Sequence, residues 1–79
     1  MTNRTNKYEV IIASDVSDRD GIGLEIYKNG DLVVEIFRDD TERTRNITCY
    51  KNTVSLEEME EFIGIFKKEV PWEFIEYED

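Results

Sequence analysis

Apolar and polar residues alternate in three stretches of the first half of the chain, a pattern typical of β-strands. Each stretch is rich in Val, Ile, Leu or Tyr at every second position, and they span residues 7–13, 22–27 and 32–37. A fourth strand is expected over 44–50, with Ile47 and Cys49 turned inward. Because short connections join these segments, they should pair in chain order as an antiparallel meander.

The segment Lys28-Asn29-Gly30-Asp31 predicts a hairpin between the second and third strands. A two-residue turn at Asn29-Gly30 would place acidic residues opposite apolar ones on both faces of the sheet. A three-residue loop with Gly30 in the left-handed conformation would instead pair Tyr27 with Asp31. Six aliphatic residues would then share one face: Ile22, Leu24, Ile26, Leu32, Val34 and Ile36. Since a shift of one residue moves every side chain to the other face, their burial favours the bulged turn.

A helix is predicted to begin after Ser55, which is a good N-cap and has Glu58 three residues later, as in a capping box. Apolar residues recur at helical spacing and form one stripe, made of Leu56, Met59, Phe62, Ile63 and Phe66. Pro71 should end the helix by about Glu69. Gly64 inside the helix costs about 1 kcal/mol relative to Ala, which suggests that a strand or a partner approaches closely there.

These patterns together predict an α+β fold, in which a four-stranded antiparallel β-meander carries one C-terminal helix on its aliphatic face. With 79 residues the chain is expected to form a single domain over 1–79, with residues 1–6 flexible. The tail 71–79 is expected as a short fifth strand or an extended segment, and the pattern does not separate the two.

The formal net charge of −9 restricts the possible partners. Residues 55–79 hold nine acids and two bases, a net of −7, whereas residues 1–54 hold ten acids and eight bases, a net of −2. Direct binding to nucleic acid or to an anionic membrane is not expected, because both need clustered Lys and Arg. The regional acidity indicates a basic protein as the partner.

Some of these acids have a local structural reason and others do not. Glu57 and Glu58 lie in the first helical turn, where they offset the helix dipole. Glu60 and Glu61 have no Lys four residues later to pair with. The candidate partner-binding residues combine such acids with aromatic anchors in the tail and are Glu60, Glu61, Trp72, Glu73, Phe74, Glu76 and Tyr77. A solvated face that aids solubility is the alternative interpretation of the same acids.

The second face of the predicted sheet is more apolar than the outer face of an antiparallel sheet normally is. It carries a possible interface of five residues, Ile11, Tyr27, Val33, Phe37 and Tyr50, interleaved with Glu9, Glu25 and Glu35. Three explanations remain open. The tail covers this face through Trp72 and Phe74, a partner or a second copy binds it, or the residues are simply scattered and exposed.

No catalytic residue, cofactor or metal site is expected. The chain has no His, and the lone Cys49 is expected as a small buried hydrophobe. The loop with Asp15, Asp18 and Asp20 resembles a calcium loop only superficially, because two positions that require acids in an EF-hand carry other residues.

A cytoplasmic location is expected from the same composition. A single Cys cannot form an internal disulfide, which fits a reducing compartment. No stretch has the apolar length of a signal peptide or a membrane span.

Several strand and turn motifs resemble a group of short bacterial proteins. The motifs are Tyr8-Glu-Val-Ile-Ile-Ala-Ser-Asp15, Arg19-Asp20, Leu24-Glu-Ile-Tyr27 and Val34-Glu-Ile36. The resemblance covers most of the chain from Tyr8 to Phe66, implies a strand-rich fold that ends in a single helix, and carries over no functional residues. In size and charge alone, the chain is also similar to small immunity proteins of bacterial toxin systems.

Two functional hypotheses follow. The first is a non-catalytic protein-binding domain, an immunity or inhibitor protein that neutralises a basic partner such as a toxin. The alternative is a homodimeric or assembly subunit that associates through the outer face of the sheet.

Overall fold

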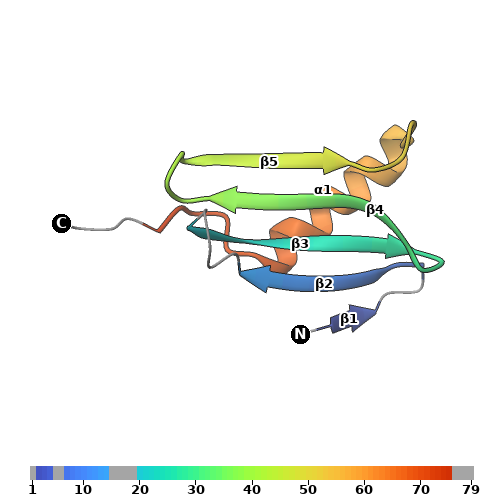
Figure 1. Cartoon of the computed structure of the whole chain (residues 1–79), viewed down its shortest axis with the longest axis horizontal. Helices are drawn as coiled ribbons and strands as arrows, with labels where there is room; N and C mark the ends of the chain where they lie inside the picture. Colours follow the sequence, from blue (N-terminus) through green and yellow to red (C-terminus); the bar gives the residue numbers. More distant parts are fainter. Residues whose placement is uncertain (1, 5–6, 15–19, 76–79) are drawn as a thin grey trace.

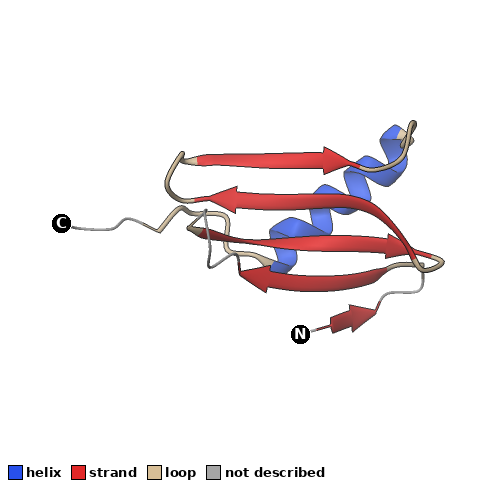
Figure 2. Cartoon of the chain, in the orientation of Figure 1, coloured by secondary structure: helices blue, strands red, loops and turns tan. Residues whose placement is uncertain are grey.

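The computed structural model describes residues 2–4, 7–14 and 20–75 of the chain. They form a layer of antiparallel strands with one helix packed behind it (Figures 1 and 2). In chain order the elements are β1 Thr2–Arg4, β2 Glu9–Ser14, β3 Gly21–Lys28, β4 Asp31–Asp39, β5 Thr44–Cys49 and α1 Leu56–Glu69. The predicted α+β fold, an antiparallel meander with one C-terminal helix, is confirmed.

The sheet has one strand more than expected, and the extra strand lies at the N-terminal end of the chain. The strand order is β1-β2-β3-β4-β5, so every strand pairs with its neighbour in sequence. Thr2–Arg4, expected within a flexible start, pairs with β2 through Ile11, Val10 and Glu9. The described part of the tail, residues 71–75, is irregular and forms no strand.

The core lies between the sheet and α1, on the face that the alternation predicted. Its buried residues are Tyr8, Val10, Leu24, Ile26, Val33, Val34, Ile36, Phe62, Phe66 and Val70. The ring of Tyr8, the residue directly before β2, meets the ring of Phe62 edge to face at 5.1 Å and joins this end of the strand to the helix. Burial of these aliphatic and aromatic side chains is the main force that holds the two layers together.

In the β3–β4 hairpin the tight turn and the change of register that buries the aliphatic residues occur at two different positions. Asn29 and Gly30 have φ values of 53° and 85°, as the two central residues of a type I′ turn require, and Lys28 pairs with Asp31. The predicted three-residue loop is therefore wrong. The register then shifts between Ile26 and Tyr27, which leaves Val33 as an extra residue in β4.

The position of this bulge changes two expected side-chain placements. Beyond it Ile26 pairs with Val34 and Leu24 with Ile36, so the aliphatic residues still share the core face. Val33 was expected on the outer face but is 4% exposed and belongs to the core. Leu32 was expected in the core but pairs with Tyr27 and is half-buried.

The helix begins and ends where the sequence indicates. The Ser55 hydroxyl accepts a hydrogen bond of 3.0 Å from the backbone N–H of Glu58, and Val70 N–H closes the last turn onto the Phe66 carbonyl. Only half of the predicted capping box forms. The Glu58 side chain turns to the sheet instead of the Ser55 backbone.

The helix crosses the sheet diagonally, running from the end near β5 towards β2 and β3 (Figure 1). Its C-terminal half therefore diverges from β5. As a result β5 has no buried residue, whereas β4 next to it is mostly buried. This divergence opens the surface described next.

Candidate partner-binding site

A groove of about 190 Å³ lies between β5 and the C-terminal half of α1. Its lining combines strand, helix and tail residues: Ile36, Arg45, Asn46, Ile47, Ile63, Phe66 and Trp72. Three large apolar side chains in it reach solvent, with Ile47 40%, Ile63 41% and Trp72 42% exposed. Large apolar groups gathered in one hollow are typical of binding surfaces, whereas single exposed ones are ordinary.

The groove exists because the core face of β5 is left uncovered. Ile47 and Cys49 pair with Ile36 and Val34, so they lie on the helix side as predicted. Both side chains are nevertheless exposed, so the helix does not cover this strand. The expectation that Cys49 is buried is therefore wrong.

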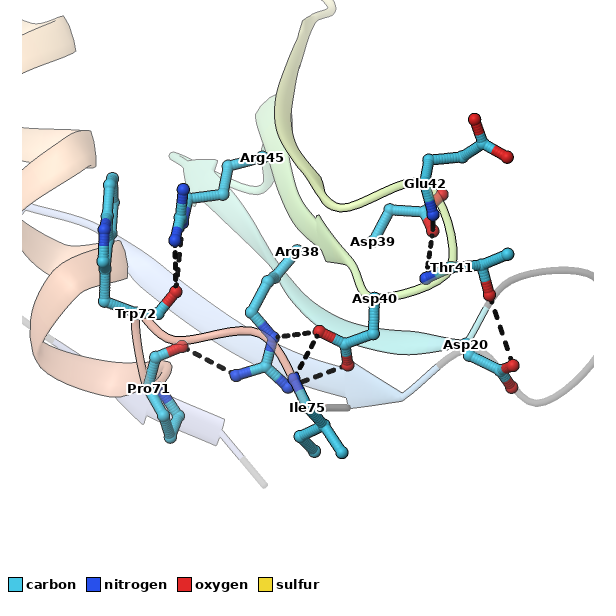
Figure 3. A network of polar contacts seen from close by, with 10 residues as sticks. All are labelled: Asp20, Arg38, Asp39, Asp40, Thr41, Glu42, Arg45, Pro71, Trp72 and Ile75. Atoms are coloured by element: carbon cyan, nitrogen blue, oxygen red, sulfur yellow. Dashed lines mark hydrogen bonds and ion pairs between the residues drawn. The ribbon is translucent and has the colours of Figure 1, made fainter. Parts of the chain in front are cut away.

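Trp72 forms the tail side of the groove. Its ring meets Phe66 of α1 edge to face at 6.4 Å, and the Arg45 guanidinium lies 3.9 Å from its centre. Arg45 also donates two hydrogen bonds, of 3.0 and 2.8 Å, to the Trp72 carbonyl (Figure 3). The Lys67 ammonium lies 5.3 Å from the same ring. The position of Trp72 is thus set by helix, strand and tail together.

A buried ion pair anchors the rest of the described tail. Arg38 donates to both oxygens of Asp40, at 2.9 and 3.1 Å, and the two side chains are 3% and 0% exposed. Arg38 also donates to the Pro71 carbonyl at 2.7 Å, and Asp40 accepts the backbone N–H of Ile75 at 3.1 Å (Figure 3). Charge-assisted bonds of this kind hold residues 71–75 against the end of the sheet.

This anchoring decides where the tail aromatic residues lie. Arg45, which stacks on Trp72, also lies 4.1 Å from the Phe74 ring centre, and Arg45 is on the helix side of the sheet. Trp72 and Phe74 therefore do not cover the outer face, which was one of the three open explanations. Glu73 is exposed, and Glu76 and Tyr77 lie outside the described residues.

A second hollow, of about 450 Å³, lies beside the anchored tail. Its lining includes Arg38 and Asp40, together with Gly21, Ile22, Pro71, Glu73, Phe74 and Ile75. The buried charges there already bond to each other and to the tail. They are accordingly engaged in structure rather than available to a ligand.

The helix acids divide into two groups. Glu61 was expected to be unpaired, but it forms an ion pair of 3.3 Å with Lys7. Glu58 pairs with Lys28 at 3.0 Å, also towards the sheet. These two partners come from distant parts of the chain, so spacing along the helix could not reveal them. Within the described part of the chain, Glu57 and Glu60 are exposed and make no ion pair.

The contact between Tyr8 and Glu58 also shifts two pKa values. The Tyr8 phenol donates a hydrogen bond of 3.1 Å to Glu58. Burial, followed by this bond and the nearby carboxylate charges, raises the pKa of Tyr8 to about 12. The hydrogen bond from Lys28, followed by the one from Tyr8, lowers the pKa of Glu58.

The outer face of the sheet offers less apolar surface than predicted. Phe37 is 3% exposed, and its ring atoms lie where a side chain on Gly23 would be. Val33 is in the core, as described above. Ile11 and Tyr27 are half-buried, and the Tyr27 hydroxyl donates to Glu25 at 3.1 Å. Of the five predicted interface residues, only Tyr50 is largely exposed, at 53%.

Across the described ranges, no three His, Cys, Asp or Glu residues lie close enough together to hold a metal ion. Asp20 accepts a hydrogen bond from Thr41, whereas Asp15 and Asp18 lie outside these ranges. No described helix is long and apolar enough to cross a membrane.

The sequence analysis named Trp72, which lines the groove, but not Ile47, Ile63 or Arg45, which line it as well. A signal for Ile63 was present, because the helical apolar stripe is wide and Ile63 lies on one border of it. Gly64 was a second signal. A Cβ there would meet no atom within 4 Å, so no strand approaches it.

No family model, curated protein or solved structure matches this chain.

Proposed function

We propose that this chain is a non-catalytic protein-binding domain that receives a basic partner protein along α1 and the groove beside β5. The observation that carries the proposal is the shared exposure of Ile47, Ile63 and Trp72 in one hollow. Apolar and aromatic anchors in a partly formed pocket are the groups that contribute most binding energy at protein interfaces. Trp72 is held by Arg45 and Phe66, so little side-chain freedom would be lost on binding.

Gly64 supports the same surface. It follows Ile63 on α1, is exposed, and has open space where a side chain would lie. A helix-interior Gly costs about 1 kcal/mol relative to Ala, and no contact within the described chain accounts for it. A partner backbone that approaches the helix closely at this point would account for it.

The chemistry of the partner follows from charge. Glu57 and Glu60 lie three residues apart on the exposed side of α1, and Glu60 lies three residues before Ile63. Their carboxylates and the net charge of −9 would speed the encounter with a cationic surface. A toxin whose basic site is covered by this domain is the partner class that best fits a small acidic binding protein.

Affinity capture from the source organism tests the proposal. The wild-type chain should retain a basic protein at about 0.1 M salt and release it at about 1 M, where the Debye length falls to about 3 Å. Glu60→Lys and Ile63→Ser should each weaken the capture. Glu42→Lys makes the same charge change on an exposed turn and should not. Capture of no basic protein at low salt, or equal capture by Glu60→Lys, would contradict it.

A second candidate is an assembly subunit that associates through the outer face. Tyr50 favours it, because 53% of this residue is exposed at one end of that face, and Ile11 and Tyr27 are half-buried there. Tyr50→Ser should then abolish self-association without changing the fold, as followed by light scattering and circular dichroism. A monomer at high concentration would remove this candidate.

A further inference from the structure

The two edges of the sheet differ in how they are protected. β1, at one edge, has three residues, and short edge strands offer little backbone for pairing. β5, at the other edge, has six residues and pairs with β4 in an unbroken register from Cys49 to Thr44. It contains no Pro and no bulge, two of the devices that keep an edge strand from pairing, and Arg45 is its single charged residue. Within the described chain, β5 pairs only with β4.

The backbone groups that face the open edge can be identified from the ladder. Tyr50 N–H donates to the Val33 carbonyl at 2.8 Å, so Tyr50 turns its backbone towards β4. Residues alternate in this respect along an antiparallel strand, so Thr48 also faces β4. The outward-facing N–H and C=O groups therefore belong to Arg45, Ile47 and Cys49.

The β3–β4 ladder gives the same assignment independently. Asp40 N–H donates to the Asp20 carbonyl at 2.8 Å, so Asp40 and Arg38 face β3. Phe37, the residue directly before Arg38, therefore faces β5 and pairs with Asn46. Asn46 then faces β4, and its neighbours on β5 face outward.

We propose that β5 is a self-association edge, at which two copies of this chain pair β5 to β5, antiparallel and centred on Ile47. In this register Ile47 faces Ile47 of the second copy, and Arg45 faces Cys49 of the second copy. All three outward-facing residues then find a facing residue, and each such pair exchanges two N–H···O=C hydrogen bonds. The two sheets become one continuous sheet with both helices on the same side.

Side-chain chemistry favours this register over the neighbouring ones. Ile47 is 40% exposed on the helix side and would meet its own copy there. On the other face Asn46 would lie opposite Thr48 of the second copy, a polar pair. A register centred on Arg45 would place two guanidinium groups opposite each other, and like charges directly opposite destabilise a strand pair.

The charge of the strand explains why two acidic chains can meet at this edge. β5 carries Arg45 as its single charge and contains no carboxylate, in a chain with a net charge of −9. Two copies therefore approach without acids of the paired strands facing each other. Their remaining acids still repel over longer distances, so added salt should strengthen the association. Binding of a basic partner should respond to salt in the opposite way.

Sedimentation equilibrium of the full chain tests the proposal. At high concentration the dimer fraction should rise from about 0.15 M to about 1 M salt, as the Debye length falls from about 8 to about 3 Å. Ile47→Pro should leave only monomer, because it removes an outward N–H that β4 does not use. Circular dichroism should show an unchanged fold. A monomeric wild type at high salt, or a dimer that persists in Ile47→Pro, would overturn the proposal.

Two further variants separate this edge from the other surfaces. Tyr50→Ser should leave the β5 dimer intact, whereas it would abolish an outer-face dimer. Glu60→Lys should weaken capture of a basic partner but not the dimer. Loss of the dimer in Tyr50→Ser with no loss in Ile47→Pro would assign self-association to the outer face and reject β5.

Engineered cysteines that form disulfides between the two copies can test the register of the β5–β5 pair. In Ile47→Cys with Cys49→Ser, the two copies should crosslink readily, because facing Cα atoms in a hydrogen-bonded antiparallel pair are about 5.5 Å apart, within disulfide range. Thr48→Cys with Cys49→Ser is the matched control and should crosslink poorly, because Thr48 faces Asn46 of the second copy. Faster crosslinking through position 48 would contradict the register.

Discussion

Arg38 and Asp40 form a buried, bidentate ion pair at the end of β4. The pair does not act as an isolated salt bridge. Through Pro71 and Ile75 it fixes the tail, and the tail presents Trp72 to the groove. A buried pair at the end of the sheet therefore supports a surface on its helix side.

Asp40→Asn should destabilise the protein strongly, because it leaves the Arg38 guanidinium buried without a balancing charge. Loss of one partner of a buried pair typically costs about 3–5 kcal/mol. Urea denaturation followed by tryptophan fluorescence measures the change, and the Trp72 signal of the folded state should shift as the tail loosens. Glu42→Gln, on the adjacent exposed turn, is the control and should change stability little. Equal stability of the two variants would show that the pair does not hold the tail.

The Tyr8–Glu58 contact predicts how stability depends on alkaline pH. The pKa of Tyr8 is raised from 10.0 to about 12, so the folded state retains a proton that the unfolded state releases. The stabilisation is therefore complete below pH 10 and is lost as pH rises towards 12. Tyr8→Phe should lack this part of the loss of stability at alkaline pH, measured as the free energy of unfolding against pH. An unchanged difference between wild type and Tyr8→Phe across that range would contradict the prediction.

The same contact has an acid counterpart with the opposite sign. The pKa of Glu58 is lowered in the folded state, so the carboxylate stabilises the fold above the unfolded pKa of 4.5. This contribution is lost as pH falls from that value through the lower folded pKa. In Glu58→Gln the free energy of unfolding should therefore fall less on acidification than in the wild type, as shown by urea midpoints measured at successive pH values. Glu57→Gln, one residue earlier and without an ion pair among the described residues, should reduce this fall less.

Two glycines should respond to alanine in opposite directions. Gly64→Ala should stabilise the protein by about 1 kcal/mol, because the helix gains a better former and the new Cβ meets no atom within 4 Å. Gly23→Ala should destabilise it by about 1–3 kcal/mol, because its Cβ would lie 2.7 Å from both the Ile36 carbonyl oxygen and the Phe37 ring. Thermal unfolding of both variants measures the contrast. A stabilised Gly23→Ala would mean that Phe37 can move aside at little cost.

For the β3–β4 hairpin, the sequence predicted the correct core face but the wrong turn. Alternation placed Leu24, Ile26 and Val34 correctly on the core face. The turn and the hydrophobic pattern demanded registers that differ by one residue, and the prediction satisfied both by enlarging the loop. The protein instead keeps the tight Asn29-Gly30 turn and absorbs the extra residue at Val33, which gains burial in the core.

The candidate site was less accessible to the same reasoning. Trp72 and Glu60 could be proposed from the sequence, because an aromatic residue in the tail after Pro71 and an acid without a Lys four residues later are visible in the chain. Glu61 could not be assigned correctly, because its partner Lys7 is distant in sequence. Ile47 and Ile63 read as ordinary core residues, since their periodicity is that of a strand and a helix packed on each other.

Local chemistry in the sequence determined β2 to β5, the helix and the face of each that turns to the core, from the alternation along the strands, the Ser55 cap and Pro71. The tertiary structure alone decided the diagonal course of α1 across the sheet. That course depends on how Phe62 and Phe66 pack against several strands at once, which no local pattern specifies. Because the helix diverges from β5, side chains with the periodicity of a core become a groove, and the edge beside them stays open.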